Sequence, residues 1–306
     1  MGHQHTHHVP HGHRHAFRLT VLLNAGLSAL QIVVGLAFGS IALVGDALHN
    51  LGDVAGLLLG WWAEVLNRRP AQGRFSYGYG RATQLAALAN AVLILVAAVL
   101  VCVEAISRFG QPEPLIAGPV AWAAIGGLVV NLVSAHLFSG GHRQDLNRRA
   151  AVLHLLSDAA VSAAVLLSTM LITLTGWTWL DPFTGLLVGL CVGWMGFTLL
   201  RDSLSECLDA TPTHINLARV RTTLETLAGV ESVHHLHVWA LSTSRVALSA
   251  HLVCDADYRS HDLLLLETAR ERLCELGVDH TTLQLESSAY PCGEEVCGAS
   301  EATDQR

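Results

Sequence analysis

The sequence HNLGD at residues 49–53 and its counterpart HLLSD at residues 154–158 lie inside long apolar stretches. Each places a histidine four residues before an aspartate, so in a helix the two side chains share one face. Ionisable groups within a membrane-spanning helix are costly and typically mark an ion or proton pathway. Two imidazoles and two carboxylates also form a complete ligand set for a tetrahedral divalent metal such as zinc. The repeated pair therefore predicts membrane helices that meet at a polar site.

The composition separates the chain into two parts of different character. Of its 306 residues, 51% are hydrophobic and only 14% are charged, whereas about 25% are charged in soluble domains. Up to Leu204 there are 11 arginines against 9 acidic residues, and from Ser205 onward there are 7 against 16. The first part is typical of a segment embedded in a lipid bilayer, and the second is typical of a soluble acidic domain. An acidic domain argues against nucleic acid as a partner.

Six apolar runs are long enough to cross a bilayer, for which about 20 residues are needed. Their expected bounds are Phe17–Gly39, Ile41–Leu66, Gln84–Ser107, Pro119–Phe138, Ala150–Thr175 and Pro182–Cys207. The arginines of the connecting segments fall almost entirely on one side, and the other side holds only Arg108. By the positive-inside rule, both termini are expected in the cytoplasm of a multi-pass protein of the inner cell membrane.

The residues after Pro212 follow a different pattern. Helical periodicity over His214–Ala228 and His261–Leu276, with strand-like alternation between and after them, predicts a small sandwich of order α-β-β-α-β. The strands are expected at Val233–Ala240, Val246–Cys254 and Thr281–Glu286. The predicted fold is thus an α-helical membrane protein with six transmembrane helices and a cytoplasmic α+β domain. The expected parts are a His-rich cytoplasmic tail at residues 1–16, a transport domain at 17–207, the α+β domain at 208–290 and a Cys-containing tail at 291–306.

The two histidine–aspartate pairs have a simpler explanation as hydrogen-bonded contacts between helices. Two identical pairs on different helices favour a metal or proton site, because neighbouring carboxylates in a low dielectric repel unless a cation or proton lies between them. A catalytic zinc keeps an open coordination position, whereas four protein ligands leave none, and the chain has no His-Glu-x-x-His sequence. Passage of a metal in exchange for protons is therefore the preferred hypothesis. Asp46, one helical turn before His49, and the adjacent Asn50 are candidates to support the ligands or to carry protons.

At these residues the chain resembles the cation diffusion facilitator family, in particular its zinc-exporting bacterial members. The matching sequences are GSIAL at residues 39–43, YGYGR at 77–81, DP at 181–182, HVW at 237–239 and SAH at 249–251, together with the two pairs. The resemblance implies a homodimer in the lipid bilayer, a metallochaperone-like cytoplasmic domain and metal/proton antiport by alternating access. It implies that zinc is the substrate, with cadmium or cobalt as further possibilities, and that the transport ligands are His49, Asp53, His154 and Asp158.

The resemblance also points to regulatory zinc in the cytoplasmic domain. Candidate ligands there are His234, His251, His280 and Glu286, and Cys292 and Cys297 in the tail could add thiolates. Some relatives bind a second metal between the second and third spans through His and Asp, but Phe75 and Tyr79 stand there, so no site is expected in that loop. Seven histidines, His3, His5, His7, His8, His11, His13 and His15, would form a loose metal collector.

Two other functions compete with transport. A membrane-bound metal sensor or buffer would use the His-rich tail and the cytoplasmic ligands, but it gives no reason for charged pairs inside the spans. An intramembrane metallohydrolase would need an open metal position and a base, for which the sequence offers no motif. In the preferred interpretation the protein is not an enzyme.

Divalent ions bound between the acidic domains of two subunits would relieve their repulsion and favour the active dimer.

Overall fold

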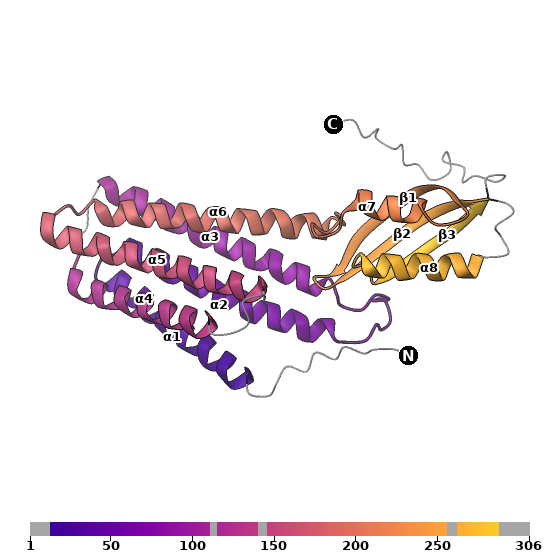
Figure 1. Cartoon of the computed structure of the whole chain (residues 1–306). Helices are drawn as coiled ribbons and strands as arrows, with labels where there is room; N and C mark the ends of the chain where they lie inside the picture. The colour runs from indigo at the N-terminus through magenta and orange to yellow at the C-terminus, as the bar shows by residue number, and fades with distance from the viewer. Residues whose placement is uncertain (1–12, 111–114, 140–145, 256–261, 288–306) are drawn as a thin grey trace. The chain divides into compact units, whose positions relative to one another are not determined.

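A computed structural model describes residues 13–110, 115–139, 146–255 and 262–287 (Figure 1). The chain forms two compact units, and each unit is made of two separate segments of the sequence. Of the described residues, the first unit contains 13–62, 86–110, 115–139 and 146–201, and the second contains 63–85, 202–255 and 262–287.

Six long helices account for the apolar part of the chain. They are α1 (His13–Ala37), α2 (Ile41–Asn67), α3 (Ala82–Gly110), α4 (Ala117–Ser139), α5 (Leu146–Thr175) and α6 (Leu180–Cys207). Five of them have a described stretch that is long and apolar enough to cross a membrane, and in α1 the corresponding stretch, Val21–Ala37, is shorter. The expected helical membrane domain is confirmed, and the helix ends differ from the expected ones by a few residues.

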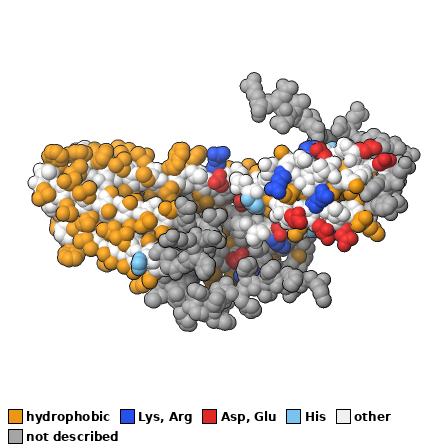
Figure 2. Space-filling model, viewed as in Figure 1, with side chains coloured by type: hydrophobic (Ala, Val, Ile, Leu, Met, Phe, Trp, Pro, Cys, Tyr) orange, Lys and Arg blue, Asp and Glu red, His pale blue; other side chains and the backbone are white. Residues whose placement is uncertain are grey.

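In the first unit, large side chains lie on the surface and small side chains lie in the interior. Large apolar side chains such as Trp122, Leu174 and Trp194 are 75%, 80% and 74% exposed, and Figure 2 shows hydrophobic groups gathered over this surface. Small residues fill the interior, and Ala47 and Ala105 are fully buried. Helices that pack in a bilayer typically turn large side chains toward lipid and small side chains toward one another. The hydrophobic effect does not drive helices together in lipid, so their packing depends on close approach of the backbones.

The start of α2 is fixed by a buried carboxylate from α6. The Asp181 carboxylate accepts hydrogen bonds from the Ser40 hydroxyl at 2.6 Å and from the Ile41 backbone N–H at 2.7 Å. The Ser40 Oγ in turn accepts from the Leu43 N–H at 3.1 Å, as an N-capping residue does. At Gly185 of α6, a Cβ would meet the Ile41 side chain at 2.9 Å, so glycine is needed where α6 passes this point. These contacts explain why α2 begins at Ile41 and hold the helix in register.

A three-stranded sheet forms the centre of the second unit. The strands β1 (Val230–Ser242), β2 (Arg245–Cys254) and β3 (His280–Ser287) lie in the order β1-β2-β3, with the first pair antiparallel and the second parallel. Helix α7 (Leu217–Glu225) precedes β1, and α8 (Asp262–Glu275) makes the crossover that a parallel pair requires. The order α-β-β-α-β is confirmed.

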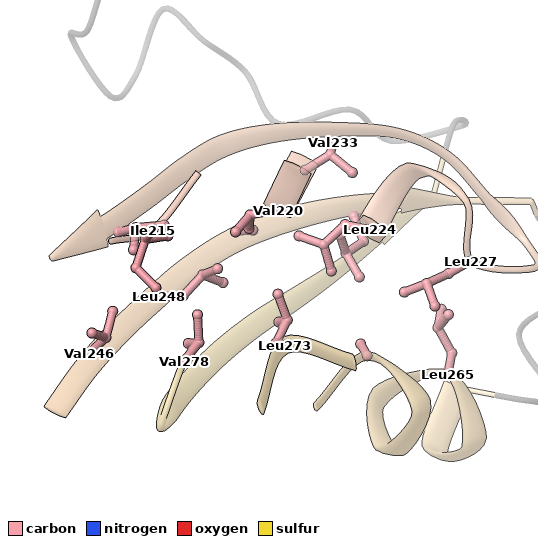
Figure 3. Close-up of a cluster of buried hydrophobic side chains, with 14 of the residues drawn as sticks. Ile215, Val220, Leu224, Leu227, Val233, Val246, Leu248, Leu265, Leu273 and Val278 are labelled. Carbon is pink, nitrogen blue, oxygen red and sulfur yellow. The ribbon is translucent and has the colours of Figure 1, made fainter. Parts of the chain in front are cut away.

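One face of this sheet packs on the two helices. Alternate residues of β2, such as Leu248 and Leu252, point into a core with Leu224 of α7 and Leu273 of α8, and all four side chains are fully buried (Figure 3). The strand period of two places the intervening residues of β2, including His251, on the opposite face. The hydrophobic core thereby decides which side chains are available for binding.

The segment between α2 and α3 belongs to the second unit. The Gln84 side chain donates to the Ala240 carbonyl at 3.3 Å, the Thr243 N–H donates to the Thr83 hydroxyl at 3.2 Å, and Arg81 pairs with Asp209. A Cβ at Gly80 would collide with the Leu241 carbonyl oxygen. The last glycine of the YGYGR sequence is therefore explained by close backbone approach.

Leu248→Ala should weaken the sheet domain, because it removes a fully buried side chain and leaves a cavity. We expect the opening free energy of the β2 amides to fall by about 2–5 kcal/mol. Leu263→Ala is the matched control, since this leucine of α8 is 85% exposed, and it should change the value by less than about 0.5 kcal/mol. Hydrogen–deuterium exchange of the full-length protein measures both. Equal effects of the two variants would contradict this account of the core.

Candidate metal centres

The side chains of His49, Asp53, His154 and Asp158 meet between α2 and α5 and are called the paired site below. The His49 Nε2 lies 3.3 Å from an Asp158 carboxylate oxygen and 3.9 Å from one of Asp53. The His154 Nε2 lies 3.2 Å from an oxygen of Asp53 and 3.7 Å from one of Asp158. Each imidazole therefore contacts both carboxylates, one from its own helix and one from the other.

This crosswise arrangement follows from the direction of the helices. Within each helix the four-residue spacing places the histidine and the aspartate on one face. His49 contacts Asp158, and Asp53, one turn later in α2, contacts His154, one turn earlier in α5. This pattern requires that the two helices are antiparallel. The two rings lie edge to face with centroids 6.1 Å apart. Neither helix carries more than one pair, so the site exists only where both helices are packed.

The paired site has a closed end and an open end. The side chains of His49 and Asp158 are each 5% exposed, whereas those of Asp53 and His154 are 30% and 39% exposed. The buried carboxylate of Asp158 needs positive charge nearby, which protonated imidazoles or a divalent cation can supply. An ion held here would reach the exterior past Asp53 and His154.

Beyond the closed end lies a second buried carboxylate. Asp46 is fully buried, and its carboxylate accepts a hydrogen bond from the Ser162 hydroxyl at 2.8 Å and a long one from the Asn50 amide at 3.5 Å. Sequence reasoning missed Ser162. Its signal was the spacing, since it follows Asp158 by one helical turn on the same face of α5.

A second group of possible ligands lies on the sheet, and we call His234, His251 and Glu286 the sheet site. The His234 Nε2 and the His251 Nδ1 lie 3.0 Å and 2.7 Å from the two Glu286 oxygens. The three donor atoms all lie within 4.8 Å of one another. His234 and His251 are paired across β1 and β2, and Glu286 reaches them from β3. Two imidazoles and a carboxylate at this separation can hold a divalent metal.

The other predicted cytoplasmic ligands are not part of this group. His280 begins β3, opposite Ala247, and its ring contacts Tyr77 edge to face at 5.9 Å. It precedes Glu286 by six residues, or about 20 Å along an extended strand. Cys292 and Cys297 lie outside the described residues, as do the tail histidines up to His11. In the loop between α2 and α3, the Phe75 and Tyr79 rings contact each other with centroids 4.7 Å apart and planes tilted by 32°.

Two family models match consecutive parts of the chain. The cation efflux transmembrane domain matches residues 18–208, and the cation efflux protein cytoplasmic domain matches residues 212–288. Together they describe a multi-pass membrane protein whose C-terminal domain is cytoplasmic. This agrees with the helices and the α+β domain of the structure and assigns the chain to transporters rather than enzymes.

Curated relatives match over nearly their whole length. The zinc transporter ZitB of Escherichia coli is 34% identical over 98% of this chain and 97% of its own. The metal cation efflux system protein CzcD of Cupriavidus metallidurans is 32% identical over 95% and 92%. A cadmium, cobalt and zinc/H(+)-K(+) antiporter of Bacillus subtilis is 30% identical over 95% and 93%. These matches confirm the resemblance noted from the motifs, and the chain belongs to the cation efflux family, also called the cation diffusion facilitators.

Proposed function

We propose that this protein exports zinc from the cytoplasm in exchange for protons, with His49, Asp53, His154 and Asp158 as the transport ligands. The observation that carries the proposal is the crosswise contact of two imidazoles with two carboxylates at 3.2–3.9 Å between α2 and α5. Four donors of this kind form the tetrahedral set that zinc prefers. The relatives, a zinc transporter and a cadmium, cobalt and zinc/H(+)-K(+) antiporter, support the same substrate class.

The exposure of the ligands supports loading from the cytoplasm. Because the C-terminal domain is cytoplasmic, the end of α6 is cytoplasmic, and so are the start of α5 and the end of α2 in a six-helix array. Asp53 and His154 are the ligands nearer those ends, and they are the exposed pair. His49 and Asp158 lie deeper and are buried. We assign this structure to the cytoplasm-facing state of an alternating-access cycle.

Exchange for protons follows from the chemistry of the ligands. Imidazole binds zinc only in its neutral form and carboxylate only in its ionised form, so the metal and protons compete for the same atoms. Asp46, with Ser162 and Asn50, extends the polar groups beyond the closed end of the paired site. We assign these three residues to the proton path.

Regulation is assigned to the cytoplasmic domain of a homodimer. Zinc bound at the sheet site, by His234, His251 and Glu286, would add positive charge to an acidic domain and lower the repulsion between two subunits. His280, Cys292 and Cys297 remain further candidates for ligands contributed in other states or by the partner. The rival function, a sensor or buffer without transport, also uses the sheet site, and the flux experiment below separates the two.

Replacing a transport ligand should abolish zinc flux. In proteoliposomes with an imposed pH gradient, we expect Asp53→Asn and Asp158→Asn each to lower zinc affinity and flux by more than about 100-fold, because even partners of metal ligands contribute 10–100-fold. The matched control is Asp202→Asn, an exposed aspartate near the end of α6. Flux that survives both ligand substitutions would mean that the pairs only hold the helices together, and the sensor function would then be favoured.

Asp46→Asn should separate proton coupling from zinc binding. The change keeps the size of the side chain and one oxygen that can accept from the Ser162 hydroxyl, so zinc affinity should change by about tenfold or less. Flux driven by a pH gradient should fall much further than zinc-for-zinc exchange, because the amide cannot accept a proton. Isotope exchange and gradient-driven uptake measured on the same vesicles give this ratio. An unchanged ratio would remove Asp46 from the proton path.

A further inference from the structure

The backbone of β1 is irregular at His235. This residue has a φ of 48°, in the left-handed region, and among the described residues only Asp209 is another non-glycine with positive φ. The pairing of β1 with β2 also shifts here, because His234 lies opposite His251 while His237 lies opposite Ser249. Two residues of β1 therefore face one residue of β2, which defines a β-bulge.

The bulge changes which face of the sheet His235 can reach. In a regular strand, successive side chains point to opposite faces of the sheet. His234 lies on the face that carries His251, so His235 would point to the other face, into the core. In the structure, Leu236 packs against the core instead, and His237 returns to the outer face. The extra residue of the bulge is His235, so two consecutive histidines can stay on the side of the sheet that carries His251.

The ring contacts place His235 at the border of the sheet site. Its centroid lies 5.2 Å from that of His234 and 5.0 Å from that of His251. The His234 Nε2 and the His251 Nδ1 are buried and have no hydrogen bond of normal geometry, although each lies close to a Glu286 oxygen. The Gln284 amide donates to Glu286 at 2.9 Å and fixes the orientation of the carboxylate.

The backbone strain at His235 is unfavourable, so we expect this histidine to have a function that offsets it. A non-glycine residue in the left-handed region costs about 1–2 kcal/mol, and glycine is the usual occupant of this bulge position. Zinc sites that are not catalytic hold four protein ligands, whereas the sheet site supplies three. Strained residues that the surrounding fold holds in place cluster at ligand sites.

We infer that His235 is the fourth ligand of the sheet site, so that one subunit alone supplies three imidazoles and one carboxylate to a regulatory zinc ion. The inference rests on the proposed function of the sheet site. The donor atoms of His234, His251 and Glu286 already lie together, and the His235 ring lies close enough that a rotation of its side chain would bring a ring nitrogen toward them. The β-bulge makes this possible, because it keeps His235 on the same face of the sheet as His234 and His251. A complete set within one chain means that neither the Cys292–Cys297 tail nor a partner subunit is needed for binding.

The test compares two neighbouring histidines of β1 in the full-length protein. His235→Asn removes the imidazole but keeps a residue that tolerates the left-handed backbone. His237→Asn is the matched control, because His237 lies on the same strand and is exposed. Both are made with Asp53→Asn and Asp158→Asn, which disable the paired site, and the tail histidines are common to all variants. The readouts are zinc affinity and the visible absorption of bound cobalt, which is intense only when the metal is tetrahedral.

We expect His235→Asn to weaken zinc binding by at least about tenfold and to reduce the cobalt absorption, and His237→Asn to change neither. A His235→Gly variant should behave like His235→Asn, since glycine relieves the backbone strain. If His235→Asn binds as the parent does while His251→Gln loses the metal, the fourth ligand is not His235 and the three-residue site stands. If His251→Gln also binds as the parent does, the sheet site itself is wrong, and the proposed regulation falls with it.

Discussion

Two carboxylates inside a membrane protein must share positive charge, and the first unit is organised around this constraint. Asp53 and Asp158 each contact both imidazoles of the paired site. Their mutual repulsion in a low dielectric is relieved by a divalent cation or by protons on the histidines, and the two solutions exclude each other. On this basis we propose that the paired site exchanges a metal ion for protons and that access from two sides makes it a transporter.

The packing of the helices serves this site. Asp181 of α6 fixes the start of α2, two turns before His49, and Gly185 permits the close contact beside it. At Gly127 of α4, a Cβ would meet the Ser162 hydroxyl at 3.0 Å, so this glycine leaves room for the side chain that binds Asp46. Small residues inside and bulky residues toward lipid keep the ligand helices close. The polar groups are thus positioned by contacts that lie away from them.

The sequence predicted what depends on local spacing. Helix periodicity and length predicted the six helices, strand alternation predicted the sheet, and the four-residue spacing predicted which helix faces carry His49, Asp53, His154 and Asp158. It could not predict that His49 would face Asp158 more closely than Asp53, because this depends on the packing of two helices distant in sequence. It also did not single out His235, because a β-bulge breaks the alternation on which strand assignments rest. His280 matched a ligand position by resemblance, yet the register of β3 places it about six residues, or ~20 Å, from Glu286.

The claim that one site holds either zinc or protons is tested most directly by counting protons. Zinc is added to the full-length protein in weakly buffered detergent solution, with the sheet site disabled by His251→Gln, and the protons released per bound zinc are measured near the pH at which imidazole titrates. The account predicts that tightly bound zinc releases at least about one proton, and that this release is lost when His49 and Asp158 are replaced by glutamine and asparagine, while any release from the tail histidines stays the same. Binding of zinc without release of protons at that pH would contradict the exchange mechanism.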